Sequence, residues 1–272
     1  MYSSNNTDVV EHISVFLFGA LCVCTFTGNI LVIIILITDS KLHKKQNAFI
    51  GLLSLADMSY SISSFLITNQ TDSKNDFNIV WCIVDGTLLT SVLSLAAIAI
   101  DRYIALIWAP FRYNIIVTPK RCVTVCLLLG FGPVVLFYII YNFDYNISNY
   151  IIIVCVSVTL TMNTCLYRNI YKQLQRKQGD IPVMQQDLEE SKKLLKTFII
   201  VVGIFIMTWI PYIIITVIIQ ILFNYEKVSF DSYLLIMVNA YGLTLLNSLA
   251  NPIIYCFRMP SFRRAALKLV CH

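Results

Sequence analysis

The sequence predicts an all-α membrane protein, a bundle of seven transmembrane helices followed by a short amphipathic C-terminal helix. Hydrophobic residues make up 58% of the 272 residues and charged residues only 13%, whereas a soluble domain carries about 25% charged residues. Several apolar stretches are long enough to cross a bilayer as helices. The basic residues also gather in segments that would lie on one side of the membrane. We therefore expect one domain over residues 1–272, covered by lipid on its outer surface.

The expected spans follow from length, because about 20 apolar residues at 1.5 Å per residue cross the hydrocarbon core. They cover residues 12–38, 47–67, 78–107, 122–141, 150–173, 193–223 and 231–257. The last segment, 260–270, is too short to span. Its apolar and basic residues fall on opposite helical faces, which is typical of a helix lying on the membrane surface. The apolar face holds Phe262, Ala266, Leu269 and Val270.

Charge predicts the orientation of the chain. Of the 20 lysines and arginines, all except Lys74 and Lys227 fall in alternate loops and the adjoining span ends. Since cytoplasmic loops are enriched in Lys and Arg, we expect a multi-pass plasma-membrane protein with an extracellular N-terminus. The N-x-S/T glycosylation sequons begin at Asn5, Asn69 and Asn146, all on the predicted outer side. The net charge of +5 reflects this bias toward anionic lipid and does not indicate nucleic-acid binding.

Asp57 lies in the middle of the second expected span, where a carboxylate costs about 2.5–3.5 kcal/mol on insertion scales. Such a group usually faces the interior of the bundle. Other polar residues lie at matching depths in their spans: Asn29, Ser91, Asn247 and Asn251. We expect one polar cluster, which holds either a cation or ordered water. A hydrogen-bonded network without an ion is the alternative reading.

Two prolines interrupt the sixth and seventh spans, Pro211 in TWIPY and Pro252 in NPIIY. Each removes a backbone donor and bends its helix, so that one half can swing. Asp101 and Arg102 come at the cytoplasmic end of the third span, where the arginine can reach water or pair with its neighbour. Taken alone, such a pair is an interfacial anchor.

Six motifs occur in order along nearly the whole chain: Gly28-Asn29, LSLAD, DRY, TWIP, NSLANPIIY and FRR. In this order, on seven spans of this orientation, they resemble those of the rhodopsin-like (class A) G-protein-coupled receptors. The resemblance implies a receptor that binds an extracellular ligand and activates heterotrimeric G proteins in the cytosol.

The resemblance also implies residue roles. Arg102 would engage the G protein, Trp209 would act as a toggle beneath the ligand, and the sixth span would pivot at Pro211. The residues implied in the switch are Asp101, Arg102, Tyr103, Tyr167, Phe205, Trp209, Pro211, Asn251, Pro252 and Tyr255. Tyr167 and Tyr255 would meet Arg102 through water in the active state. Allosteric sodium would bind Asp57, Ser91, Asn247 and Asn251, and Cys271 would carry a palmitoyl group.

The chain departs from the family pattern in several places. Segment 142–149 has no cysteine, so the usual disulfide to the top of the third span is not expected for Cys82. Ser191 stands where an acid often pairs with Arg102, which argues against an inner salt bridge. The short second outer loop and DRYIALIWAPFRYNIIVTPKR are similar to those of melanocortin receptors. However, Phe77 and Trp81 replace the acidic pair that those receptors carry.

Asp85 is the acid within reach of a ligand in the third span, one residue beyond Val84 at the family's amine-binding position. We expect the ligand-binding residues to be Asp85, Trp209, Tyr212 and Tyr241. The outer loops hold more acidic than basic residues, which favours a small cationic molecule or a peptide. Alternatively, the Asp85 carboxylate pairs with a neighbouring helix.

Other functional classes are less compatible with the sequence. No nucleophile–base set or metal-binding spacing indicates an enzyme, and no cofactor is expected apart from the sodium ion. A transporter or channel is the alternative function, but it predicts internal repeats and paired broken helices, which we do not find. A retinal-binding light sensor needs a lysine in the seventh span, and 231–257 contains none.

Overall fold

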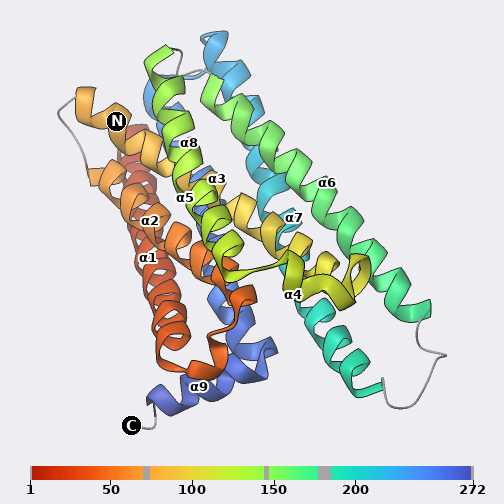
Figure 1. Ribbon diagram of the computed structural model, residues 1–272. Coiled ribbons are helices and arrows are strands. Elements are labelled where there is room, and N and C mark those ends of the chain that lie inside the picture. Colours follow the sequence, from red (N-terminus) through yellow and green to blue (C-terminus); the bar gives the residue numbers. More distant parts are fainter. Residues whose placement is uncertain (1, 70–73, 144–146, 177–184, 271–272) are drawn as a thin grey trace.

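The computed structural model describes residues 2–69, 74–143, 147–176 and 185–270. Within these ranges every regular element is a helix, so the predicted all-α class is confirmed (Figure 1). The long helices are α1 (Tyr2–Thr38), α2 (Ala48–Asn69), α3 (Lys74–Tyr103), α5 (Pro119–Phe143), α6 (Ile147–Arg176), α7 (Gln185–Asn224) and α8 (Phe230–Arg258). The short elements are η1 (Ser40–Leu42), η2 (Lys45–Asn47), η3 (Ile104–Trp108), η4 (Pro110–Arg112), α4 (Tyr113–Ile116) and α9 (Pro260–Val270).

Seven helices of the described chain are long and apolar enough to cross a membrane. Their spanning parts are Val9–Thr38, Ala48–Ile67, Ile79–Trp108, Pro119–Phe143, Ile147–Gln173, Ile199–Asn224 and Ser232–Arg258. Each of the seven expected ranges overlaps one of them. Two helices run well beyond the expected ranges, since α1 begins at Tyr2 and α7 at Gln185. A further turn of π-helix, η3, continues α3 at its C-terminal end.

Helix α3 is the central element, because it packs against α2, α5 and α6 and is buried along most of its spanning length. Gly86 makes its approach to α5 possible. A Cβ atom at this position would lie 2.6 Å from the Cα atom of Val134, closer than real contacts allow. By contrast, most of α5 faces outward, as expected of a helix covered by lipid.

Helix α9 lies across one end of the bundle next to the C-terminus (Figure 1) and packs on α8, α1 and η1. Phe262 is fully buried there, with its ring 5.7 Å from that of Tyr255 in α8. The predicted apolar face needs one correction: Ala265 is buried against the bundle, whereas Leu269 is 41% exposed. Arg263, Arg264 and Lys268 are exposed, as an amphipathic surface helix requires.

Candidate functional site

Asp57 joins three helices in the middle of the bundle. Its side chain is fully buried in α2. One carboxyl oxygen, Oδ1, accepts hydrogen bonds from Ser91 Oγ of α3 at 2.7 Å and from Ser248 Oγ of α8 at 2.8 Å. The other, Oδ2, accepts from Asn251 Nδ2 of α8 at 3.0 Å. The expected cost of a carboxyl group inside the bundle is therefore offset by three interhelical hydrogen bonds.

Asn29 brings α1 into the same cluster. Its Nδ2 atom donates to the carbonyl oxygen of Thr25 at 3.0 Å and to that of Ser248 at 3.3 Å. The Ser248 carbonyl lacks a helical partner because Pro252, four residues later, has no N–H. Asn29 thus satisfies the acceptor that the proline frees, as a bend inside a membrane requires. Gly28 leaves room for this contact, since a Cβ atom there would lie 3.2 Å from Pro252 Cγ.

The cluster differs from the expected set at one position. The structure brings together Asp57, Ser91 and Asn251, three of the four predicted sodium ligands, and places Ser248 at the fourth contact. Asn247 is also buried, but among the described contacts none joins it to Asp57. The missed signal was helical spacing, because Ser248 lies three residues before Asn251 and so shares its face.

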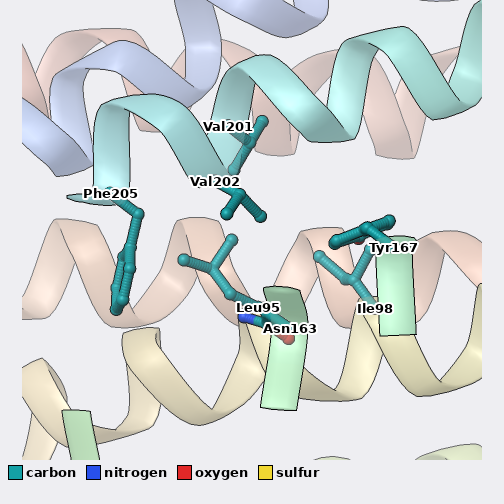
Figure 2. Close-up of a pocket in the computed structure, with 7 residues that line it drawn as sticks. All are labelled: Leu95, Ile98, Asn163, Tyr167, Val201, Val202 and Phe205. Carbon is teal, nitrogen blue, oxygen red and sulfur yellow. The ribbon is translucent and has the colours of Figure 1, made fainter. Parts of the chain in front are cut away.

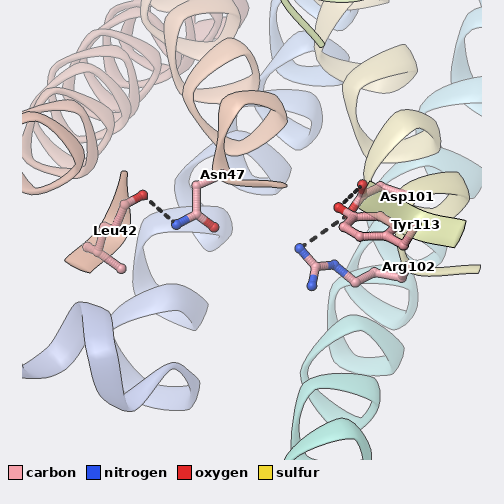
Figure 3. A network of polar contacts seen from close by, with 5 residues as sticks. All are labelled: Leu42, Asn47, Asp101, Arg102 and Tyr113. Atoms are coloured by element: carbon pink, nitrogen blue, oxygen red, sulfur yellow. Dashed lines mark hydrogen bonds and ion pairs between the residues drawn. The ribbon is translucent and has the colours of Figure 1, made fainter. Parts of the chain in front are cut away.

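At the C-terminal end of α3, Asp101 has two partners (Figure 3). Its Oδ1 atom accepts a hydrogen bond from the Tyr113 hydroxyl at 2.7 Å, and its Oδ2 atom lies 3.4 Å from Arg102 Nη2. Asp101 is 3% exposed and Arg102 is 11% exposed. Burial, together with the hydrogen bond to Asp101, raises the pKa of Tyr113 above its ordinary value. The hydroxyl therefore stays protonated and can donate.

A narrow cavity lies between α7 on one side and α3 and α6 on the other (Figure 2). The volume that the centre of a water molecule can occupy there is about 10 Å³, roughly what one water needs. Tyr167 and Phe205, two predicted switch residues, both line it. Asn163 lines it as well, and its Oδ1 atom has no hydrogen-bond partner among the described residues.

Most of the remaining switch residues lie in α7 and α8. Phe205 and Trp209 are each 1% exposed, and their ring centroids lie 5.6 Å apart. Tyr255 packs on Phe262 of α9 in this structure, so the expected meeting with Arg102 is a prediction about another state. Pro211 and Pro252 lie inside helices that continue on both sides. Tyr103, the last residue of α3, is half-buried.

Toward the other end of α3, Asp85 is fully buried, and its Oδ2 atom accepts a hydrogen bond from the Tyr141 hydroxyl of α5 at 2.8 Å. This pairing with a neighbouring helix is the alternative that the sequence left open. The second carboxyl oxygen, Oδ1, has no partner among the described residues. The structure thus shows the pairing with a neighbouring helix for one oxygen, and the role of Asp85 in ligand binding stays a prediction.

A continuous row of aromatic rings connects this region to Trp209, the predicted toggle. The ring centroids of Trp81 and Tyr241 lie 5.7 Å apart, those of Tyr241 and Tyr212 5.8 Å, and those of Tyr212 and Trp209 5.3 Å. The row then reaches Phe205 at the inner cavity. Tyr212 and Tyr241 were predicted ligand residues, whereas Trp81 and Tyr141 were not among them. Aromatic residues in an apolar span give no signal that separates packing from binding.

Several predicted sites have no described side chain. Asn146 and Cys271 lie outside the described residues, so the glycosylation and lipidation predictions for them stay predictions. Asn5 and Asn69 belong by their backbone to α1 and α2. Glycosylation at these two positions likewise stays a prediction. Cys82 is described and is a buried free thiol.

Seven spanning helices around a buried acidic cluster, with an Asp–Arg pair at one end, define a seven-helix membrane receptor. Comparison with known families agrees, because the model of the rhodopsin family of seven-transmembrane receptors matches residues 28–143 and 136–255. The chain belongs to this family. It is therefore a multi-pass plasma-membrane protein of the G-protein-coupled receptor class. Membership of this family implies a receptor rather than an enzyme, and a transporter is not favoured.

Individual relatives cover almost the whole chain. Melanocortin receptor 5 of Rattus norvegicus is 30% identical over 95% of this chain and 84% of its own length. Melanocortin receptor 4 of Danio rerio is 28% identical with the same coverage. Sphingosine 1-phosphate receptor 3 of Takifugu rubripes is 28% identical over 92% of this chain and 70% of its own length. The predicted weak resemblance to the melanocortin group is thus confirmed.

The position of Ser248 in the cluster predicts the effect of removing its hydroxyl. We expect Ser248→Ala to destabilise the purified receptor in detergent by about 1 kcal/mol, because Asp57 loses one of three hydrogen bonds. Thermal unfolding measures the change. Ser54→Ala is the matched control, since Ser54 is fully buried in α2 one turn from Asp57 and its hydroxyl has no described partner. Equal effects of the two substitutions would contradict the assigned contact.

Proposed function

We propose that this receptor binds an extracellular ligand near Asp85 and transmits the binding to heterotrimeric G proteins at Arg102. The observation that carries the proposal is the row of aromatic rings from Trp81 to Phe205, which ends at the cavity beside Tyr167. A ligand that favours one packing of this row would shift the population of conformations. The element with two positions would be α7, pivoting at Pro211.

The orientation belongs to the same proposal. The N-terminus would be extracellular, because the lysines and arginines concentrate at the end of the bundle that carries Arg102, η1, η2 and α4. Asp85 would then lie in the outer half of the bundle and Arg102 at the cytoplasm. Glycosylation of Asn5, Asn69 and Asn146 would fall on the outer side.

The ligand class follows from the chemistry around Asp85. Its Oδ1 atom lacks a described partner and lies in the same part of the bundle as the rings of Tyr212 and Tyr241. A carboxylate near aromatic faces favours a cation such as an ammonium group. The relatives are named for two different ligands, so their names do not decide the class. We propose a small cationic molecule or a peptide with a basic group.

A sodium ion would fit the cluster around Asp57. The residues offer one carboxyl group together with the neutral oxygens of Ser91, Ser248 and Asn251, a set suited to a hard monovalent cation. The buried Oδ1 atom of Asn29, whose Nδ2 contacts the Ser248 carbonyl, has no described partner and adds a further oxygen nearby. These side chains would hold the ion and, through it, the relative positions of α2, α3 and α8.

The role of Arg102 is tested by G-protein activation. Arg102→Ala should reduce agonist-driven nucleotide exchange by tenfold or more, on the order of 1.4 kcal/mol or above, because the G protein loses its charged contact. Surface expression should change little. Arg112→Ala removes the same charge from the exposed element η4 and serves as the control. Undiminished coupling in the Arg102 variant would remove the switch role.

The ligand class is tested with a screen in cells that reads second messengers. The panel should contain primary, secondary and quaternary amines, basic peptides and anionic lipids. We expect agonists among the cations, and Asp85→Asn should weaken their potency at least about tenfold by removing the paired charge. Glu226→Gln, in an exposed outer turn, controls for the general loss of negative charge. Agonists found only among anionic lipids would contradict the proposal.

Sodium binding is tested by titrating NaCl against KCl at constant ionic strength. In the wild type, sodium should lower basal nucleotide exchange, because the occupied cluster holds α2, α3 and α8 together. Asp57→Asn keeps the shape but removes the charge, so the difference between the two salts should disappear. A sodium response in the variant equal to that of the wild type would favour a network without an ion.

A further inference from the structure

Lys45 lies in the segment between α1 and α2. It makes three contacts with the segment between α3 and α5. Its Nζ atom donates to Asn114 Oδ1 at 2.9 Å and to the carbonyl oxygen of Val117 at 2.5 Å. The same ammonium group lies 4.7 Å from the centroid of the Tyr113 ring, within the range of a cation–π interaction. The side chain is half-buried, unlike that of the exposed Lys44 beside it.

These contacts hold an element that has little stability of its own. Helix α4 spans only Tyr113–Ile116, and helices this short are unstable in isolation. Its last carbonyl groups need donors, and cations near a helix C-terminus are favourable. Lys45 supplies a donor to Val117, and Arg121 of α5 supplies donors to Ile115 at 3.4 Å and Ile116 at 2.8 Å. Two cations from separate elements thus fix α4.

The loop that carries Lys45 is itself fixed. Asn47 is 7% exposed, and its Nδ2 atom donates to the carbonyl oxygen of Leu42 at 2.8 Å, which closes the turn between η1 and η2 (Figure 3). A lysine on a closed turn loses less conformational freedom when it binds than one on an open loop. Because its own turn is fixed, Lys45 can restrict the position of α4.

The position of α4 matters because Tyr113 is its first residue. The Tyr113 hydroxyl donates to Asp101 Oδ1, and the other oxygen of Asp101 faces Arg102. A shift of α4 by a fraction of its length would break the 2.7 Å hydrogen bond. Asp101 would then be left with one partner inside the bundle, which is unfavourable for a buried carboxylate.

We propose that Lys45 is a positioning residue that keeps the receptor at rest. It holds α4 so that Tyr113 restrains Asp101, and Asp101 keeps Arg102 beside it and away from the G protein. The inference rests on the proposed role of Arg102 in coupling.

The test uses Lys45→Met in the full chain, reconstituted in lipid nanodiscs with a purified G protein. Methionine keeps most of the side-chain length but not the charge. Basal nucleotide exchange should rise at least about threefold as the resting state loses its restraint. Lys44→Met removes the same charge from an exposed position without a described side-chain contact and should leave the basal rate unchanged. Lys45→Arg keeps the charge and should restore the low basal rate.

A double-mutant cycle shows whether Lys45 acts through Tyr113. Tyr113→Phe should also raise basal exchange, and the double variant should exceed neither single variant, because both remove the same restraint. Hydrogen–deuterium exchange of residues 113–117 gives a readout that needs no G protein. We expect faster exchange there in Lys45→Met and no change in Lys44→Met.

Three outcomes would overturn the inference. One is a basal rate in Lys45→Met equal to that in Lys44→Met. Another is faster hydrogen exchange of α4 with no gain in basal activity, which would make Lys45 a loop anchor only. The third is additive effects of Lys45→Met and Tyr113→Phe. Failure of the proposed function is distinguishable, because nucleotide exchange would then be the same with and without the wild-type receptor, and both proposals would fall.

Discussion

The structure depends on one constraint: a polar atom buried in a lipid-covered bundle is costly unless it finds a partner inside the bundle. Asp57 meets it with three hydrogen bonds that join α2, α3 and α8. Asn29 satisfies a second buried group, because its amide donates to the Ser248 carbonyl that Pro252 leaves without a donor. The cluster thus fixes how four helices pack, although lipid outside the bundle gives little hydrophobic drive for helix association.

The same constraint operates at the two ends of α3. Asp85 is tied to Tyr141 by one oxygen, and Asp101 is tied to Tyr113 by one oxygen. In each case the other oxygen is buried without a hydrogen bond among the described residues, and that of Asp101 lies 3.4 Å from Arg102 Nη2. A tyrosine hydroxyl therefore anchors each carboxyl group through one of its two oxygens. Helix α3 is thus tied to a neighbouring element by a polar contact on each side of the Asp57 cluster.

The sequence was sufficient for the seven spans and for most of the Asp57 cluster, because both depend on polar residues standing out in apolar segments. Helix α7 extends to Gln185 in a polar stretch where hydropathy gives no signal. Ser248 was missed beside Asn247, although its spacing from Asn251 was a usable clue. The contacts of Tyr113 and Lys45 were beyond prediction. Lys45 reaches a segment about 70 residues away, and the Tyr113–Asp101 contact crosses two turns between helices, so neither follows a helical or strand period.

The central claim is that the inner half of α7 moves away from α3 when the receptor engages its G protein. The most direct measurement is the distance between spin labels on noncanonical amino acids at Val123 of α5 and Ile199 of α7, both of which are exposed. Adding a nucleotide-free heterotrimer should produce a second, longer distance in the wild type. A single distance that stays the same with and without the heterotrimer would contradict the account.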